Sequence, residues 1–363
     1  MKQVEQWFAE ALAEREARGL LRRRHSPLSG VPFHTNDYLG LSQESGFGVR
    51  GSRAVVGDSE SVRNLERALA RWVDLEDALV LSSGYAANLA ALQAAVGPGD
   101  RVVSDACNHA SIVDGLRLAK ADVRVVPHLD LDAVAEALGS RGATQRAWVV
   151  TESYFGMDAD QPAIGRLADL CEVSRAGLIV DEAHALGVFG PEGGGLCKAA
   201  GVRPSVLIGT LGKAVAGVGG FVSGSALFAE LVWNRGRSFV FSTAIGDATA
   251  MELNVAVARA RSADDARARL AENVNFIRSR LAQGGVRCMG HGHIVPIWVG
   301  EAVVATKMAE WLISRGLAMY PMRYPTVAQG QARLRLAVTA RMTHEELDWA
   351  AGLIQEAASC FGL

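Results

Sequence analysis

Short hydrophobic runs alternate with helical stretches through the middle of the chain. A short apolar run rich in β-branched residues and bounded by polar positions is typical of a buried strand. Because strands that alternate with helices form βα units, the pattern predicts a mainly parallel sheet covered by helices on both faces. The predicted strands are Ala78–Leu81, Arg101–Val103, Val123–Val126, Trp148–Val150, Leu178–Val180 and Val206–Ile208.

The pattern differs on either side of this region. Apolar positions at helical spacing predict an amphipathic helix over residues 2–21 and another over 59–72. A strand that ends in two hydroxyls is expected over 238–243 and a long helical region over 246–284. Weak strands at 294–298 and 333–338, with helices at 302–315 and 344–359, form an α+β pattern. We therefore expect an N-terminal helix or arm (1–35), a large domain (36–245), and a linker helix with a small C-terminal domain (246–363).

Composition excludes several classes of protein. Of the 363 residues, 49% are hydrophobic and the net charge is −2, which argues against a nucleic-acid or anionic-membrane surface. No apolar run approaches the ~20 residues of a membrane helix, and no secretory leader is evident. The five cysteines are scattered and include no C-x-x-C pair. Their pattern indicates a reducing cytoplasm and argues against a disulfide framework or a zinc site.

Polar residues follow the predicted strands at the edge where parallel sheets bind ligands. Ser83-Gly84-Tyr85 lies between a strand and a helix, so its backbone N–H groups are suited to a phosphate. A buried carboxylate such as Asp181 needs a cationic partner, which a protonated pyridine nitrogen would supply. Each residue taken alone also fits a capping or core polar group. Further candidates after these strands are His109, which could stack on a flat ring, Ser153 and His184.

Lys213 is the central candidate residue of the predicted site. It follows the strand Val206–Ile208 and the hydroxyl of Thr210, and small residues flank it. We interpret it as a buried lysine whose pKa is lowered, so that its neutral amine holds an aldehyde cofactor as a Schiff base. The alternative is a lysine at a strand end that extends into water.

Other motifs have structural explanations beside functional ones. The cluster Arg22–Arg24 fits a solvated helix end, and its functional alternative is a phosphate contact to a charged carrier substrate. Gly46-x-Gly48-x-x-Gly51 matches a dinucleotide motif, but no strand precedes it, so we interpret it as a loop. His291 and His293 have no third metal ligand at suitable spacing. Arg333 and Arg335 share one strand face, which is either exposed or a carboxylate clamp.

Taken together, these motifs resemble the α-oxoamine synthases, pyridoxal-phosphate enzymes of the aspartate-aminotransferase fold type. The resemblance runs from about residue 36 to 339, in the order that the family shows. The motifs that carry it are Ser83-Gly-Tyr-Ala-Ala-Asn88, Asn108-His-Ala-Ser111, Thr151-Glu152, Met157-Asp158, Asp181-Glu-Ala-His184, Gly209-Thr-Leu-Gly-Lys213, Arg323-Tyr-Pro-Thr-Val327 and Ala332-Arg-Leu-Arg335.

The resemblance implies a role for each matching residue. Lys213 would carry the cofactor and move the substrate α-proton, Asp181 would pair with the pyridine nitrogen, and His109 would stack on the ring. His184 would lie near the phenolic oxygen and Ser153 would contact the cofactor. The phosphate would be held by Ser83, Gly84, Tyr85 and Thr210, with Ser242 and Thr243 reaching over from the second subunit of a homodimer. The residues that the resemblance implies for substrate binding are Asn36, Arg323 and Arg335.

The implied reaction is a decarboxylative condensation of an amino acid, L-alanine, with an acyl thioester of coenzyme A or a carrier protein. Sister activities would use glycine or serine. A different class is an NAD-dependent oxidoreductase built on Gly46–Gly51, but no strand precedes that motif. A third is an inactive relative that acts as a binding partner, but the chain retains Asp181, His184 and Lys213. The chain departs from the family at Val62, where a histidine is usual, at Gly156, where a serine is usual, and in a shortened segment near 41–46.

Overall fold

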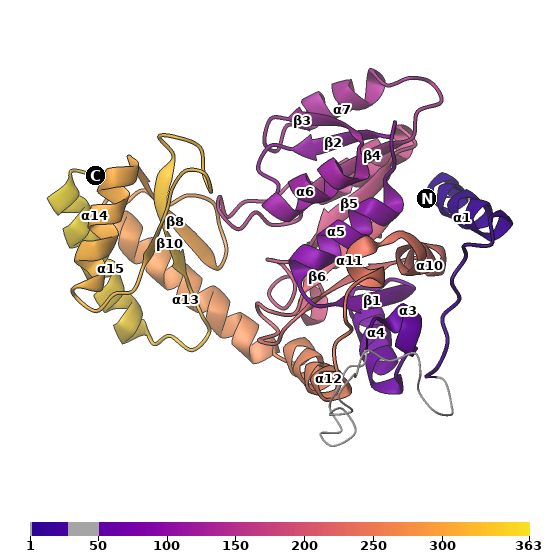
Figure 1. The fold of residues 1–363 in the computed structure, drawn as a ribbon. Helices are drawn as coiled ribbons and strands as arrows, with labels where there is room; N and C mark the ends of the chain where they lie inside the picture. Colours follow the sequence, from indigo (N-terminus) through magenta and orange to yellow (C-terminus); the bar gives the residue numbers. More distant parts are fainter. Residues whose placement is uncertain (1, 28–50) are drawn as a thin grey trace. The chain divides into compact units, whose positions relative to one another are not determined.

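The computed structural model describes residues 2–27 and 51–363, which form two compact units. The first unit comprises residues 1–153 and 161–262, and the second comprises 154–160 and 263–363 (Figure 1). Asn36 and most of the Gly46–Gly51 motif lie outside the described residues. No helix in the described ranges has the length and apolar character needed to cross a bilayer.

A seven-stranded sheet forms the centre of the first unit, in the order β1-β7-β6-β5-β4-β2-β3. Neighbouring strands from β6 to β3 are parallel, whereas β7 is antiparallel to both β6 and β1. The sheet is therefore mainly parallel, as predicted, and the six predicted strands are all present. The strands are β1 (Asp77–Leu81), β2 (Arg101–Asp105), β3 (Asp122–Val126), β4 (Ala147–Glu152), β5 (Gly177–Asp181), β6 (Val206–Thr210) and β7 (Gly220–Gly224).

Helices cover both faces of this sheet (Figure 1). Alternate strand residues point to opposite faces, so Val102 joins one core cluster and Val103 the other. The first cluster packs against α1 (Lys2–Ala17), α5 (Gly84–Ala95), α6 (Ala110–Ala119), α10 (Ala226–Arg235) and α11 (Arg237–Val240). The second packs against α4 (Glu60–Trp72), α7 (Leu131–Gly139), α8 (Ile164–Val173), α9 (Leu196–Ala199) and α12 (Asp247–Arg261). Two short elements, α3 (Arg53–Val56) and the 3₁₀ turn η1 (Pro191–Gly193), complete the unit.

The second unit has a three-stranded antiparallel sheet in the order β8-β10-β9. Its own apolar cluster includes Ile277, Leu334 and Ile354, which are fully buried. The predicted α+β pattern of this part of the chain is confirmed. Its elements are α13 (Asp264–Gln283), β8 (Ile294–Gly300), α14 (Ala302–Ile313), β9 (Tyr320–Met322), β10 (Ala332–Ala337) and α15 (His344–Phe361).

One sequence prediction about an element was wrong. Residues 238–243 do not form a strand, because α11 spans Arg237–Val240 and buries Phe239 and Val240 beside Trp233. The apolar run therefore reflects burial of a short helix rather than a strand period. The predicted helical region 246–284 is confirmed, and it consists of two helices, α12 and α13, with Ser262 as the C-cap of the first.

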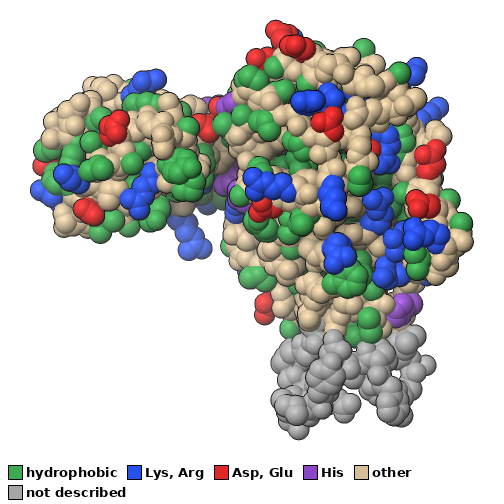
Figure 2. Space-filling model, turned by 45° about the horizontal axis from the view of Figure 1, so that its top comes forward, with side chains coloured by type: hydrophobic (Ala, Val, Ile, Leu, Met, Phe, Trp, Pro, Cys, Tyr) green, Lys and Arg blue, Asp and Glu red, His purple; other side chains and the backbone are tan. Residues whose placement is uncertain are grey.

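The basic cluster at residues 22–24 is engaged within the chain. Arg22 donates to the backbone carbonyl of Asn234, Arg23 pairs with Glu16 and Glu230, and Arg24 pairs with Asp77. These contacts favour the structural explanation of the cluster. Figure 2 shows acidic and basic side chains interspersed over the visible face, in keeping with the balanced net charge.

A buried ion network joins α3 to α4 in the first unit. The Arg53 guanidinium lies 2.7 Å from Asp58 and 2.5 Å from Glu66, and all three side chains are at most 5% exposed. Burial by itself lowers the pKa of Arg53, but the two carboxylates raise it overall. Arg53 also lies over the rings of Trp233 and Phe239. It therefore stays charged inside the fold and forms an ion pair with each of two buried acids.

We predict that Arg53→Met destabilises the protein by about 3–5 kcal/mol, because it leaves the buried Glu66 without its ion pair and Asp58 with only a longer contact to Arg63. Arg63 provides a matched control, since it also faces Asp58 at 3.5 Å but is 42% exposed. Arg63→Met should cost less than about 1 kcal/mol. Urea unfolding followed by circular dichroism measures both values, and equal losses would contradict the assignment.

Candidate active site

Several of the predicted site residues lie at the ends of three neighbouring strands. Asp181 ends β5 and lies in register with Glu152, which ends β4. Thr210 ends β6, and Lys213 follows three residues later. Because β4, β5 and β6 are parallel, their carboxyl ends meet at one edge of the sheet. The strand order thus brings together polar residues that lie far apart in the sequence.

Asp181 is a buried carboxylate that accepts hydrogen bonds from two neutral donors. Its Oδ2 accepts a hydrogen bond from Asn88 Nδ2 at 2.7 Å, and its Oδ1 accepts one from the backbone N–H of Ala183 at 2.8 Å. The side chain is fixed from two directions, by α5 and by the turn after β5. Since neither donor is charged, the carboxylate remains suited to a cationic partner.

A hydrogen-bonded chain connects Asp181 to His109. Asn88 Nδ2 also lies 3.0 Å from Ser111 Oγ, and Ser111 Oγ lies 2.7 Å from His109 Nδ1. The Oδ1 atom of Asn88 is buried and has no hydrogen-bond partner among the described residues. This series of hydrogen bonds orients the imidazole ring of His109 through its Nδ1 atom.

Glu152 holds the backbone of His109. Its Oε1 accepts the His109 N–H at 2.8 Å, and its side chain is buried. Burial, with a further contribution from Asp181, raises the pKa of Glu152 well above its ordinary value, and Lys213 opposes the shift. The same two charges act on His109: packing around the ring lowers its pKa, Asp181 opposes this, and Lys213 adds to it. Asp181, Lys213, Glu152 and His109 therefore lie in one electrostatic environment.

The N-terminus of α5 is packed tightly against β6 and β7. Ser83 is the N-cap and accepts the backbone N–H of Ala86 at 3.0 Å. A Cβ on Gly84 would lie 3.2 Å from Thr210 Cβ, and a Cβ on Gly220 would lie 2.6 Å from Gly84 Cα. Position 220 therefore requires glycine, and at position 84 a Cβ would have to displace the Thr210 side chain, which lies beside the turn formed by Ser83-Gly84-Tyr85.

Tyr85 extends the same turn towards α6. Its hydroxyl donates a short hydrogen bond to Asp114, and its ring meets the His109 ring edge-on, 6.4 Å between centroids. Tyr85 is 42% exposed. The predicted phosphate turn and the predicted stacking histidine are therefore neighbours.

Lys213 is exposed, and the prediction that it is buried was wrong. It lies in the connection between β6 and β7, where Gly212 and Ala214 are exposed as well. The small residues around it belong to a tight loop that returns to the antiparallel strand β7, and they do not indicate a buried environment. Its charge still acts on both His109 and Glu152, so the amine lies at the same edge of the sheet.

Four other predicted residues of the first unit lie as follows. Ser153 is fully buried and its hydroxyl donates to Glu182 at 2.8 Å. His184 is partly exposed in the turn after β5. Ser242 and Thr243 line a small pocket with Ser82 of the same chain, next to the phosphate turn. The Ser153 hydroxyl is thus already used in a hydrogen bond within the fold.

The two predicted substrate-binding arginines that the structure describes belong to the second unit. Arg323 is exposed and donates to Thr306 at 3.1 Å. Arg335 Nε donates to the carbonyl of Gly156 at 2.9 Å, and burial lowers its pKa. Its neighbour Arg333 is buried and paired with Asp158 at 2.6 Å. Arg333 is therefore satisfied within the fold, which leaves Arg335 as the better candidate for a ligand carboxylate.

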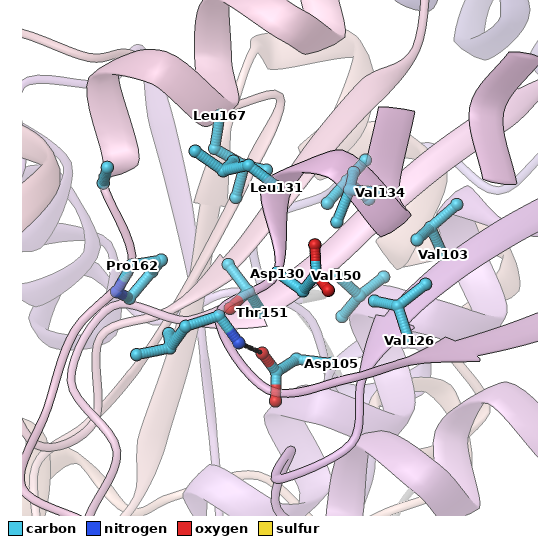
Figure 3. Close-up of a pocket in the computed structure, with 13 residues that line it drawn as sticks. Val103, Asp105, Val126, Asp130, Leu131, Val134, Val150, Thr151, Pro162 and Leu167 are labelled. Atoms are coloured by element: carbon cyan, nitrogen blue, oxygen red, sulfur yellow. Dashed lines mark hydrogen bonds between the residues drawn. The ribbon is translucent and has the colours of Figure 1, made fainter. Parts of the chain in front are cut away.

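A cavity on the face covered by α7 and α8 does not belong to this site. It is lined mainly by apolar residues such as Val103, Val134 and Leu167 (Figure 3). Its volume of about 30 Å³ suffices for one or two waters. It is too small for a cofactor or a substrate.

Sequence reasoning assigned no role to three residues of the site, Asn88, Ser111 and Glu152. Asn88 and Ser111 stand inside motifs that were recognised, and Glu152 directly precedes Ser153. Their distances along the sequence from His109 and Asp181 follow neither a helical nor a strand periodicity. The hydrogen bonds that join these residues therefore depend on the fold. The available signal was their place at the end of a strand, as for Glu152, or in the first two turns of a helix, as for Asn88 and Ser111.

The residues present fit pyridoxal phosphate. The glycine-lined turn beside Thr210 suits a phosphate, because its helix N-terminus favours an anion. The buried Asp181 suits a protonated ring nitrogen, and Lys213 supplies an accessible amine. These features come from independent elements and meet at one edge of the sheet.

Comparison with known proteins agrees with this fit. The aminotransferase class I and II family matches residues 31–354. An 8-amino-7-oxononanoate synthase from Citrifermentans bemidjiense is 35% identical over 99% of this chain and 100% of the relative. One from Alkalilimnicola ehrlichii is 38% identical over 94% of this chain and 95% of the relative.

A solved serine palmitoyltransferase from S. paucimobilis with bound PLP and myriocin has the same fold. It has a TM-score of 0.84 at 25% identity, and the similarity covers 99% of this chain and 98% of that one. The family match spans most of the chain and the sequence relatives exceed 30% identity. The chain therefore belongs to the aminotransferase class I and II family, and within it to the pyridoxal-phosphate-dependent α-oxoamine synthases.

Proposed function

We propose that this protein is an 8-amino-7-oxononanoate synthase, which condenses L-alanine with a pimeloyl thioester and releases CO2. The observation that carries the proposal is the buried Asp181 carboxylate, held by Asn88 and Ala183 at the edge of the sheet that Lys213 also reaches. The names of the sequence relatives supply the product, 8-amino-7-oxononanoate, and the resemblance to the α-oxoamine synthases supplies the two substrates. The acyl carrier is coenzyme A or a carrier protein.

The chain's own residues would act as follows. The turn at Ser83–Tyr85 and the Thr210 hydroxyl bind the phosphate, and Asp181 holds a proton at the pyridine nitrogen. Pyridoxal phosphate, when bound, withdraws electrons from the α-carbon of the amino acid. His109 packs on the ring, oriented at Nδ1 by Ser111 and at its backbone by Glu152. Lys213 supplies the amine that joins the cofactor, and it then moves the proton at the α-carbon.

In this proposal Arg335 binds the carboxylate of the amino acid, and Asn36 and Arg323 contribute to substrate binding. Burial of Arg335 beside a backbone carbonyl strengthens a charge-assisted hydrogen bond to an incoming carboxylate. His184 would lie near the phenolic oxygen. The five cysteines are all free, which supports a cytoplasmic location.

A sister activity with serine or glycine is the second candidate, because solved serine palmitoyltransferases share the fold. The cofactor absorbance separates the two when each amino acid is added in turn. A spectral change on addition of L-alanine supports the first candidate. A response to serine or glycine alone would support the second.

The proposal includes a homodimer in which Ser242 and Thr243 complete the partner's phosphate site. Apolar side chains exposed in the single chain include Phe241 (67%), which precedes Ser242 in the sequence, and Met251 (55%) and Val255 (52%) on α12. Apolar groups exposed together are typical of an interface. Thr243 also lies near Ser82 of its own chain, so a contribution within one subunit is the alternative.

We predict that Lys213→Ala removes the covalent attachment of the cofactor and lowers the turnover by roughly 10²–10⁴-fold, the usual range for a lost acid–base group. Borohydride should fix the yellow colour on the wild-type protein, so that it survives denaturation and gel filtration. Lys307→Ala, a change of an exposed lysine in the second unit, is the control and should retain the colour. Colour fixed equally on Lys213→Ala would overturn the role of this lysine.

The charges around His109 predict opposite shifts of its pKa in two variants. In the cofactor-free protein, Lys213→Ala should raise the pKa of His109, because a cation that disfavours the imidazolium is lost. Asp181→Asn should lower it further, because a stabilising anion is lost. NMR titration of the ring C–H signals, assigned with a His109→Gln variant, measures both shifts. Shifts of the same sign would show that the two charges do not both face the ring.

Mixing two defective variants tests the contribution from the partner subunit. We expect Thr243→Val to weaken phosphate binding at least about tenfold, since a hydrogen bond to a charged group is lost. If Thr243 acts across the interface, a heterodimer with a Lys213→Ala subunit contains one complete site. Random reassociation should then restore about a quarter of the wild-type activity. No gain above the separate variants would place Thr243 in the site of its own subunit.

A further inference from the structure

Three potential metal ligands meet at the carboxyl ends of β2 and β3. Asp105 ends β2, Cys107 follows it by two residues, and His128 follows the end of β3 by two residues. One ligand atom from each residue lies within 4.8 Å of the other two. None of the three has a role in the proposed function.

Asp105 organises this cluster through its hydrogen bonds. Its Oδ1 accepts the backbone N–H of Cys107 at 2.8 Å and lies 2.7 Å from His128 Nδ1. Its Oδ2 accepts the backbone N–H of Leu129 at 2.9 Å, the bond drawn at Asp105 in Figure 3. These bonds fix both connections, the one after β2 and the one after β3. The residues that carry the thiol and the imidazole are thus positioned by the same carboxylate.

A purely structural explanation covers only part of the arrangement. The pair Asp105–His128 links two neighbouring strand ends, and such a pair would do so with any residue at position 107. The backbone N–H of residue 107 would likewise bond to Asp105 whatever its side chain. What remains to be explained is a thiol that is solvent-accessible and lies within reach of both partners.

We infer that Asp105, Cys107 and His128 form a binding site for a divalent transition-metal ion of the zinc class. Thiolate and imidazole together select Zn²⁺, whereas Mg²⁺ and Ca²⁺ prefer oxygen ligands throughout. Three protein ligands and an accessible position for water complete a tetrahedral shell.

The distances suit this assignment. In a tetrahedral zinc site with bonds of about 2.0–2.3 Å, the ligand atoms lie about 3.3–3.8 Å apart. The ligand atoms here lie within 4.8 Å of one another, and Asp105 Oδ1 and His128 Nδ1 are only 2.7 Å apart, so small rotations of the exposed Cys107 and the partly exposed His128 would bring all three to this spacing. The bound ion would replace the proton shared by Asp105 and His128, and the Cys107 thiol would also release its proton.

The test is a titration of the holoenzyme with Co²⁺, whose tetrahedral complexes absorb visible light at longer wavelengths than the cofactor. We expect one equivalent to bind with a tetrahedral spectrum and Zn²⁺ to displace it. Cys107→Ser should weaken binding at least tenfold, and so should His128→Gln. Cys360→Ser is the matched control, because Cys360 is also exposed but lies in α15, and it should bind as the wild type does.

Alkylation provides a second measurement on the unmodified chain. Zn²⁺ should slow the reaction of Cys107 with iodoacetamide, read by peptide mass spectrometry, and should leave the rate at Cys360 unchanged. The inference is overturned if the wild type binds no stoichiometric Co²⁺, or if Cys107→Ser binds as tightly as the wild type. Equal protection of both cysteines, or equal loss of binding in both cysteine variants, would also overturn it.

Discussion

The buried carboxylate of Asp181 is the constraint on which the site depends. A negative charge inside a fold is costly unless hydrogen bonds and a positive charge compensate for it. Here the two hydrogen bonds come from neutral groups, Asn88 and the backbone of Ala183. Because neither donor is charged, the carboxylate can still pair with a cation, and a protonated pyridine ring would supply one. The mainly parallel sheet makes this possible, because it places the end of β5 between the ends of β4 and β6.

The same carboxylate is tied to the rest of the site through α5 and α6. Asn88 lies in the second turn of α5 and Ser111 in the first turn of α6, and they connect Asp181 to His109 without a charged residue between them. Glu152 adds a second anchor at the backbone of His109. Three separate elements therefore determine where one imidazole lies. A substitution in any of them would change the orientation of the ring while leaving the ring itself intact.

Close approach of backbone segments sets the other half of the site. β7 runs against the direction of its neighbours, and Gly220 lets it pass next to the N-terminus of α5. In this arrangement Thr210, at the end of β6, packs against Gly84. The chain then passes through the loop that carries Lys213 before it enters β7. The exposure of Lys213 follows from this geometry, since a loop between two strands at the edge of the site lies at the surface. The amine is accessible to a ligand because the loop does not enter the core.

The sequence by itself determined the sheet, its six parallel strands and most of the residues at their ends, because buried strands have a composition that local patterns reveal. It also determined the family, since the motifs occur in a fixed order along the chain. Tertiary structure alone decided what no spacing encodes: the helix at 237–240, the antiparallel β7, the exposure of Lys213 and the contacts of Asn88, Ser111 and Glu152. The cluster Asp105, Cys107 and His128 belongs with these, as twenty residues lie between Cys107 and His128 in the sequence and only the pairing of β2 with β3 makes them neighbours. Local patterns report whether a residue is buried, whereas the partners of a polar side chain are set by which strand ends the fold places side by side.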